Sequence, residues 1–292
     1  MAETKDDLKR EKVRVVSIEL IDDFPDHPFL VKDDESMDQL VKSIEMNGVL
    51  NPVIARKKEG DRYELISGHR RKHACEKLGV KNIPIIVREL SRDEAVIEMV
   101  DSNLQREYIL PSEKAKAFKM KMEALKRRAG RPSKENSSPV GTHLRTDEIV
   151  AREAGESRNQ VQRYVRLNEL TDELLEFVDE GKIGLRPAVE LSYLQEEEMR
   201  DLVDYIDNEG VFPSHAQTIR MKELSREGSL DTSTINEIMS EEKPNQKEKL
   251  KIPIEKIEMF FPSGASYQLM EETIIKALAM YRQRQKESRD TR

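Results

Sequence analysis

Polar side chains suited to reading DNA bases cluster between Ser157 and Arg166. Arginine pairs with guanine in the major groove of duplex DNA, and asparagine and glutamine pair with adenine. Ser157 and Gln160 form a capping box that begins a helix at this point, and an exposed helix N-terminus can hold a phosphate. The outward positions of this helix, which include no acidic residue, are the expected DNA contacts: Ser157, Arg158, Asn159, Gln162, Arg163 and Arg166.

The surrounding sequence predicts that this helix is the second one of a helix-turn-helix over residues 146–167. Ala151 is small enough to let two helices cross closely, and Gly155 reaches positive φ in the turn without steric cost. Val161 and Tyr164 supply apolar anchors for the second helix. An ordinary helical hairpin with a polar face is the alternative, but such a hairpin has no need for this combination.

A second group of polar residues, Ser67-Gly68-His69-Arg70-Arg71, follows an expected strand and begins an expected helix. A glycine turn lets the backbone approach a phosphate, and the helix start supplies N–H groups. Two arginines add charge and paired donors. These features are compatible with a bound phosphate, and the alternative is a solvated or DNA-facing arginine pair.

Metal binding near this turn is not expected. His69 and His73 share a helix face, but Cys75 lies off that face and is the single cysteine of the chain. A single cysteine cannot form an internal disulfide, which fits a reducing cytosol. The first 16 residues contain no apolar stretch typical of a signal peptide, and no run of about 18 apolar residues occurs. We expect a cytoplasmic protein without a membrane span.

Charge is unevenly distributed along the 292 residues, of which 37% are charged and 37% hydrophobic. The net charge is -7, yet residues 114–134 contain nine basic residues and one acidic residue, whereas residues 171–210 contain 13 acidic and three basic residues. The basic stretch is expected to hold a phosphate backbone. A solvated lysine-rich helix would show the same pattern.

The N-terminal part alternates between helix and strand patterns, which predicts a small α/β unit over residues 13–110 after a flexible tail over residues 1–12. A capping box at Ser36 predicts a helix that ends at Gly48, and a second box at Ser91 predicts a helix to Asn103. Pro84 favours a strand end or a sheet edge. The strands are expected at residues 52–56, 63–66 and 83–87, with a helix from residue 69 toward residue 78.

The remainder predicts helices. A long helix begins at Pro111, residues 130–141 form a flexible connection, and residues 111–240 form an all-helical domain. Residues 241–250 are an expected linker, and residues 251–292 are an expected dimerisation segment with a short strand and a helix. One face of that last helix carries Met270, Ile274, Ala277 and Tyr281.

The chain resembles the ParB family of plasmid and chromosome partition proteins. The stretches ELISGHRRKHACEKLGVKNIPIIV and SNLQREYILPSEKAKAF, followed by the helix-turn-helix, keep the order and spacing of the family's blocks over residues 13–195. The resemblance implies an α+β, mostly helical fold with a ParB/sulfiredoxin-like N-terminal domain. Sulfiredoxin chemistry needs a cysteine in the turn where this chain has His69, so reductase activity is not expected.

The resemblance also implies that CTP binds with magnesium in the N-terminal domain. The family's Gly-Glu-Arg-Arg motif corresponds to residues 68–71, and its Glu-Asn-Leu-Gln-Arg motif corresponds to residues 102–106. In that reading Asn103 helps to hold magnesium and Arg106 faces the phosphates. The expected nucleotide-binding residues are Gly68, His69, Arg70, Arg71, Ser102, Asn103, Gln105 and Arg106.

Three positions depart from the family pattern: His69 and Ser102 replace glutamates, and Phe29 stands where arginine is common. Loss of the carboxylate at position 102 argues against CTP hydrolysis, so whether the chain is a weak CTPase stays open. A nuclease would need clustered carboxylates or a histidine set near the arginine pair, and the sequence offers neither.

The expected function is sequence-specific binding of a dimer to a centromere-like DNA site, with nucleotide-gated clamping or spreading. The resemblance implies a ParA-type ATPase partner, engaged by residues 1–20, and association with the nucleoid or a plasmid. A nucleoid-occlusion or transcriptional regulator built on the same module is the alternative. Residues 130–132 match a minor-groove arm in a short stretch that also suits a plain linker.

Overall fold

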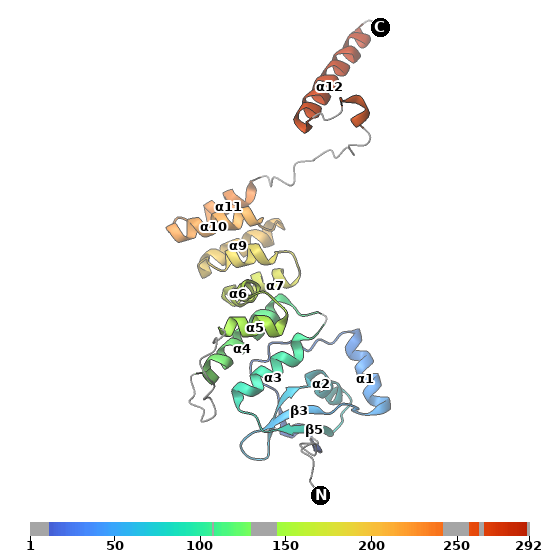
Figure 1. The fold of residues 1–292 in the computed structure, drawn as a ribbon, viewed down its shortest axis with the longest axis vertical. Helices are drawn as coiled ribbons and strands as arrows, with labels where there is room; N and C mark the ends of the chain where they lie inside the picture. Colours follow the sequence, from blue (N-terminus) through green and yellow to red (C-terminus); the bar gives the residue numbers. More distant parts are fainter. Residues whose placement is uncertain (1–11, 107, 130–144, 242–256, 263–265, 291–292) are drawn as a thin grey trace. The chain divides into compact units, whose positions relative to one another are not determined.

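The computed structural model describes residues 12–106, 108–129, 145–241, 257–262 and 266–290 (Figure 1). The chain divides into two units, residues 1–241 and residues 242–292. The described parts are mostly helical and include a five-stranded sheet, which confirms the expected mostly helical α+β class. Nearly all of the expected tail and of the expected linker, and the whole connection at residues 130–141, lie outside the described residues.

The sheet has the strand order β1-β5-β3-β4-β2. The pairs β1–β5 and β3–β4 are antiparallel, whereas β3–β5 and β2–β4 are parallel. The strands are β1 (Val13–Ser17), β2 (Ile21–Asp22), β3 (Val53–Lys57), β4 (Tyr63–Ser67) and β5 (Asn82–Arg88). The sequence predicted the three inner strands and missed β1 and β2 at the two edges.

Pro84 lies inside the sheet, so the expectation that it marks a strand end or a sheet edge was wrong. β5 has β1 on one side and β3 on the other, and Pro84 is opposite Val15 of β1. Local sequence cannot reveal this, because the strand that covers β5 comes from a distant part of the chain.

Helices cover both faces of the sheet. They are α1 (Glu35–Asn47), α2 (His69–Lys77) and α3 (Arg92–Leu104), and a short 3-10 turn, η1 (Ile18–Leu20), links the edge strands β1 and β2. Side chains alternate between the two faces along β4. Leu65 shares an apolar cluster with Met37 of α1 and Ala74 of α2, whereas Ile66 shares one with Met99 of α3.

The two expected helix caps had different outcomes. Ser91 and Glu94 form the predicted capping box of α3. The N-cap of α1 is Asp34 rather than Ser36: the Met37 N–H donates to the Asp34 carboxylate at 2.9 Å. Both side chains are good caps, so residue type alone did not decide between them.

Helix α4 is the contact between the sheet unit and the helices that follow. It packs against α3 and also against α5, α6 and α7 (Figure 1). Ala117 and Ala124 join the cluster around α3, whereas Phe118 and Met122 join the cluster around α5 and α6. The helices are α4 (Pro111–Ala129), α5 (Thr146–Ala154), α6 (Arg158–Arg166), α7 (Asp172–Asp179), α8 (Leu185–Leu191), α9 (Glu196–Glu209), α10 (His215–Glu227) and α11 (Thr232–Ser240), with the 3-10 turn η2 (Leu167–Glu169) after α6.

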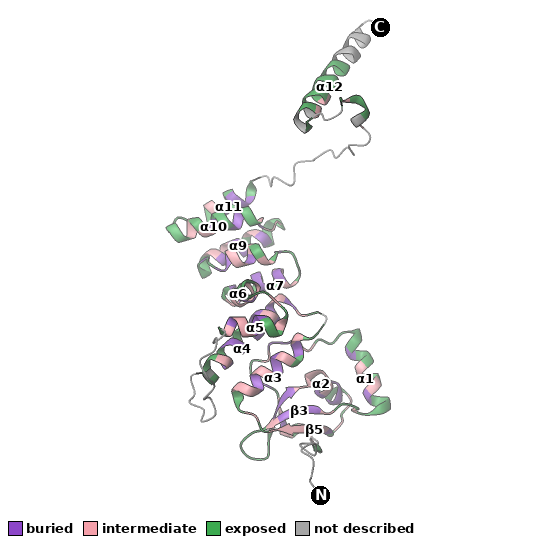
Figure 2. Cartoon of the chain, viewed as in Figure 1, coloured by how far each residue is buried: buried purple, intermediate pink, exposed green. Residues whose placement is uncertain are grey.

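The second unit contains a 3-10 turn, η4 (Glu258–Phe260), and the long helix α12 (Tyr267–Asp290). Most described residues of α12 are exposed, as Figure 2 shows, and Leu278 is 61% exposed. On the expected apolar face, Met270 and Ile274 are half-buried and Tyr281 is exposed. Most of the expected strand after residue 251 lies outside the described residues. Among the described helices, none combines the length and apolar character needed to cross a membrane.

Lys121 of α4 is fully buried, although most lysines of this helix were expected to lie off its apolar side. Its ammonium group pairs with Asp101 of α3 and with Glu153 of α5, the latter at 2.5 Å. Both carboxylates remain more than two-fifths exposed. The aliphatic part of Lys121 therefore packs as a core residue, while its charge joins helices on both sides of α4.

We expect Lys121→Ala to lower the free energy of unfolding by about 2–4 kcal/mol, because it removes a buried four-carbon stem. Lys121→Met keeps that volume and leaves two carboxylates that water still reaches, so the expected cost is below about 1.5 kcal/mol. Urea unfolding measures both, with Lys119→Ala on the exposed side of α4 as the control. Equal losses for the two Lys121 variants would contradict a packing role.

Candidate nucleic-acid interface and phosphate pocket

The predicted helix-turn-helix is formed by α5 and α6. Gly155 ends α5 with φ 66° and ψ 22°, and a Cβ at this residue would meet no neighbouring atom. The positive φ, rather than a lack of space, is therefore what favours glycine in the turn. Val161 is fully buried, and the ring of Tyr164 lies edge-on to that of Phe118 in α4, with centroids 5.8 Å apart. The expected anchors thus fix α6 against α4.

The structure shows one of the two hydrogen bonds of the capping box expected at the start of α6. Ser157 accepts a hydrogen bond from the Gln160 N–H at 3.2 Å. The Gln160 side chain accepts one from Arg163 at 3.4 Å. Gln160 therefore contributes its backbone N–H to the helix cap and its side-chain oxygen to a contact with Arg163.

Four of the expected DNA contacts are exposed together on α6: Ser157, Arg158, Asn159 and Gln162. Arg163 and Arg166 are half-buried. Arg166 donates to the hydroxyl and the carbonyl of Ser192 at 3.0 and 2.8 Å, and its guanidinium lies 4.1 Å from the centre of the Tyr193 ring. The structure thus places Arg166 against the C-terminal end of α8, apart from the exposed group.

The outward positions of α6 include no acidic residue, but α5 places a carboxylate beside them. Asp147, from the first turn of α5, accepts hydrogen bonds from Arg158 at 2.7 Å and from Gln162 at 2.8 Å. The Arg158 guanidinium lowers the pKa of the Asp147 carboxyl, which is therefore charged at neutral pH. The residues of α6 alone do not reveal a carboxylate that α5 supplies.

The predicted phosphate-binding turn joins β4 to α2. Gly68 has φ 108°, and a Cβ added to it would lie 2.7 Å from a methyl group of Val53. Only glycine fits here, on grounds of both backbone conformation and space. The turn lines a hollow of about 460 Å³, and the second motif, at the end of α3, lines the same hollow. Its lining residues are Ser36, Leu40, Ser67, Gly68, His69, Arg70, Arg71, Ser102, Asn103 and Arg106.

The three arginines that line this hollow differ in how many of their hydrogen-bond donors already have partners within the protein. Arg71 donates to the backbone carbonyls of Asn51 and Pro52 at 2.5 and 2.8 Å, which ties the turn to the start of β3. Arg70 donates to Ser36 at 2.5 Å and lies 3.7 Å from the Asp34 carboxylate, and its buried Nε has no partner among the described residues. Arg106 lies over the ring of Phe29, 5.2 Å from its centre. Arg70 and Arg106 are therefore the cations with donors left for a bound anion.

Two histidines stack beside the turn. The rings of His27 and His69 have centroids 3.7 Å apart, and each Nε2 is buried without a partner among the described residues. His27 Nδ1 is 2.7 Å from the Phe29 carbonyl, which places a proton on that nitrogen. Burial lowers the pKa of His69 to about 3, so this residue is neutral at pH 7. His69 can therefore donate a hydrogen bond to a phosphate but adds no charge.

The second motif presents one group suited to magnesium. Asn103 uses its amide NH₂ to donate to the Met99 carbonyl at 2.7 Å, which leaves its side-chain oxygen, an atom type that magnesium accepts as a ligand. Ser102 donates to the same carbonyl at 3.0 Å. Gln105 follows α3 and is not part of the lining. Asp101 pairs with Lys121, so its carboxylate does not replace the missing glutamate at position 102.

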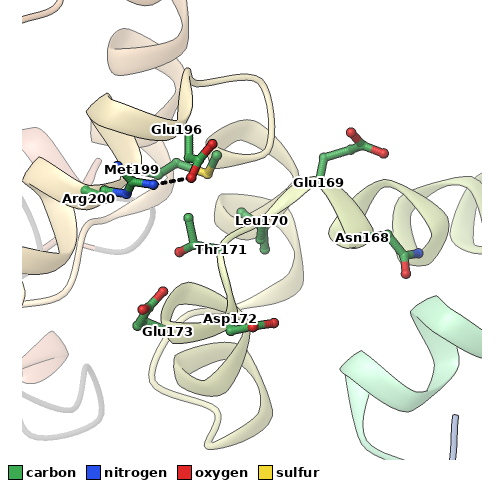
Figure 3. A pocket seen from close by; sticks show the side chains of 9 residues that line it. All are labelled: Asn168, Glu169, Leu170, Thr171, Asp172, Glu173, Glu196, Met199 and Arg200. Atoms are coloured by element: carbon green, nitrogen blue, oxygen red, sulfur yellow. Dashed lines mark hydrogen bonds and ion pairs between the residues drawn. The ribbon is translucent and has the colours of Figure 1, made fainter. Parts of the chain in front are cut away.

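Another hollow, of about 490 Å³, lies where η2 and the start of α7 meet α9 (Figure 3). Four of its nine lining residues are carboxylates. Its single basic lining residue, Arg200, pairs with Glu196. The carboxylates of this hollow repel phosphate groups, whereas the hollow at the β4–α2 turn is lined by three arginines and no carboxylate, which makes it the candidate nucleotide site.

Comparison with known proteins identifies the two domains that contain these candidate sites. Models of two domains of one family match the chain: the ParB N-terminal domain over residues 2–104 and the ParB HTH domain over residues 141–224. The chain belongs to the ParB family. The two matches cover the sheet unit with its phosphate-binding turn and the helix-turn-helix with the helices that follow it.

Relatives of this ParB chain include a nucleoid occlusion protein of Listeria innocua, 31% identical over 198 residues, which are 67% of this chain and 63% of the relative. The chromosome-partitioning protein Spo0J of Thermus thermophilus is 31% identical over 64% of this chain and 62% of its own length. The matches thus span less than two thirds of either relative.

Two solved structures of ParB from Caulobacter crescentus are also similar. One is a complex with the centromeric parS site, 25% identical over 73% of this chain and 99% of that one, with a TM-score of 0.42. The other is a complex with CTP-gamma-S, 26% identical over 67% of this chain and 98% of that one, with a TM-score of 0.31.

The neutral His69 predicts a pH dependence of stability. A histidine in the unfolded chain titrates near pH 6.5, whereas folded His69 titrates near 3, so the unfolded state binds the extra proton between these values. Stability is therefore highest above about pH 6.5 and falls as the pH drops toward 3. We expect His69→Gln to reduce the loss of stability between pH 7.5 and pH 5.5.

Urea midpoints at these two pH values measure the effect. The dependence is reduced rather than abolished, because burial also lowers the pKa of His27. His215→Gln, at an exposed site in α10, is the control and should leave the pH dependence unchanged. An unchanged pH dependence in His69→Gln would show that this imidazole titrates alike in the folded and the unfolded protein and would contradict its lowered pKa.

Proposed function

We propose that this ParB chain is a sequence-specific DNA-binding partition protein that acts as a dimer on a centromere-like site. The observation that carries the proposal is the exposed group on α6, which combines arginine, asparagine and glutamine at the start of a helix packed firmly on α4. These side chains match guanine and adenine in the major groove. The parS complex of the Caulobacter relative supports the same ligand class.

We infer a dimer because the exposed group on α6, which we call the reading face, is small. One recognition helix reads only a few base pairs, so specific binding requires two copies on a site with two related halves. The apolar residues exposed on α12 make residues 251–292 the proposed dimerisation segment. A ParA-type ATPase is the proposed partner, at residues 1–20, and the proposed location is the cytoplasm, on the nucleoid or a plasmid.

CTP is the proposed ligand of the hollow at the β4–α2 turn. The hollow has the size of a nucleotide site, and it combines a glycine turn, a helix start and the free donors of Arg70 and Arg106. Asn103 would supply a protein oxygen to magnesium, whose remaining ligands would be phosphate oxygens and water. No group of three carboxylate, histidine or cysteine side chains among the described residues could hold a metal alone.

Nucleotide-gated clamping or spreading on neighbouring DNA is part of the proposal, and CTP hydrolysis is not. Ser102 stands where the family has a carboxylate, and neighbouring Asp101 is engaged by Lys121. The same module would serve a nucleoid-occlusion or transcriptional regulator. The names of several relatives favour this second candidate, and mapping the bound sites across the genome distinguishes one site cluster from many dispersed sites.

In vitro selection from a randomised duplex library tests DNA binding. We expect the wild-type chain to enrich a site with two related halves. Arg158→Ala should then weaken binding to that site by about 1–3 kcal/mol, the value of a bidentate base contact. Arg226→Ala, at an exposed site in α10, is the matched control. Equal affinities of the two variants for the selected site would remove Arg158 from the interface.

Calorimetry with CTP and magnesium tests the nucleotide site. We expect Arg70→Ala to weaken CTP binding by about tenfold or more, because it removes a cation with unused donors from the hollow. Arg14→Ala, at an exposed site on the edge strand β1, should bind CTP as the wild type does. The same CTP affinity in Arg70→Ala, with an unchanged unfolding midpoint, would refute this location of the site.

A further inference from the structure

We propose that Asp147 is a positioning residue that sets the sequence specificity of the helix-turn-helix by holding Arg158 and Gln162 in the orientation that reads two nearby base pairs. This inference rests on the proposed DNA-binding function and adds a residue outside α6 to it. Asp147 itself contacts no base in this account and acts only through the two side chains that it holds.

The geometry joins one acceptor atom to two reading side chains. The Asp147 Oδ2 accepts from Arg158 Nε at 2.7 Å and from Gln162 Nε2 at 2.8 Å. Arg158 and Gln162 are four residues apart, so they lie on the same face of α6, one turn from each other. The carboxylate thus forms a bridge between consecutive turns of the recognition helix.

Asp147 is a fixed support rather than a mobile surface group. Its side chain is 5% exposed, whereas that of Arg158 is 43% exposed. Its Oδ1 accepts from the Glu148 N–H at 3.1 Å, and Val150 and Ala151 hold α5 in the apolar cluster with α4. The reading side chains are therefore bound at their inner atoms to a rigid element, and their outer atoms reach solvent.

The bridge determines which donors and acceptors remain for DNA. With its Nε engaged, Arg158 offers its two terminal NH₂ groups, which match the O6 and N7 acceptors of guanine. With one N–H of its amide engaged, Gln162 still offers its oxygen and a second N–H, which match N6 and N7 of adenine. We therefore expect a guanine and an adenine at nearby positions of each half-site.

Preorganisation gives the bridge an energetic effect. Ordering free arginine and glutamine side chains on binding costs up to about 2 kcal/mol each in rotamer entropy. Side chains already held by Asp147 lose less of this entropy when they meet the matching bases. This gain in binding free energy applies only to DNA whose bases match the orientation in which Asp147 holds the two side chains. It therefore raises the preference for the matching site over other DNA.

The negative charge of Asp147 changes DNA affinity in the direction opposite to the positioning effect. A carboxylate close to the interface repels the phosphate backbone of any DNA sequence, so its removal alone strengthens non-specific binding. Positioning predicts the reverse for the matching site, which should be bound more weakly. Opposite changes for matching and random DNA therefore distinguish a positioning role from a purely electrostatic one.

The test repeats the in vitro selection with full-length Asp147→Asn, Arg158→Ala and Gln162→Ala. We expect Asp147→Asn to lose base preference at the same positions as Arg158→Ala and Gln162→Ala, and to keep the other positions of the site. Its affinity for the wild-type site should fall about tenfold, while its affinity for random duplex is equal or higher. Glu148→Gln removes the neighbouring charge of α5 without touching the bridge and should retain the full preference.

The possible outcomes distinguish a failure of the proposed DNA-binding function from a failure of the positioning role of Asp147. If the wild-type chain enriches no sequence, the proposed function fails. If it enriches a site and Asp147→Asn keeps every preferred base, the function stands and the positioning role is overturned. A uniform loss at all positions indicates a structural role and overturns it as well. If Asp147→Asn unfolds, Asp147→Ser, which keeps a short acceptor, is carried through the same selection and judged by the same outcomes.

Discussion

The packing of α4 between its neighbours is the constraint on which the other features depend. Small residues on one side, Ala117 and Ala124, let α3 approach, and Phe118 on the other side forms the floor of the helix-turn-helix. Helix α3 ends in the candidate nucleotide motif, and α5 supplies Asp147 to the reading face. One helix therefore contacts the supports of both candidate sites, and Lys121 adds an ionic contact to each of these supports.

Three cations of the basic stretch at residues 114–134 form ion pairs within the protein. Lys114 pairs with Glu156, Arg127 pairs with Asp93, and Lys121 is buried between two carboxylates. These cations neutralise nearby acidic groups within the protein, so they are only partly free to attract a phosphate backbone. In the proposed interface, specificity rests on a few oriented side chains of α6, and the cations of α4 that remain unpaired would act on the phosphate backbone of any sequence.

Features set by neighbouring residues were predictable, and features set by distant residues were not. The capping box at Ser91, the glycine turn at Gly155 and the inner strands depend on local backbone preferences, which the sequence shows directly. The strand β1, the interior place of Pro84 and the bridge at Asp147 depend on segments that meet only in the fold. The two parts of the phosphate pocket were found through the family resemblance, since spacing alone does not show that they line one hollow.

The bridge and the place of Arg166 together limit what α6 can read. Arg166 is held by Ser192 and Tyr193 near the end of α8, which leaves the first two turns of α6 as the exposed part. Within these turns Arg158 and Gln162 both donate to the Asp147 carboxylate, so the orientation of one side chain is linked to that of the other. A reading face this small and this rigid distinguishes few base pairs by itself. In the proposed dimer, specificity would come from pairing two such faces at a fixed distance, so the spacing between the two copies would be part of how the DNA site is recognised.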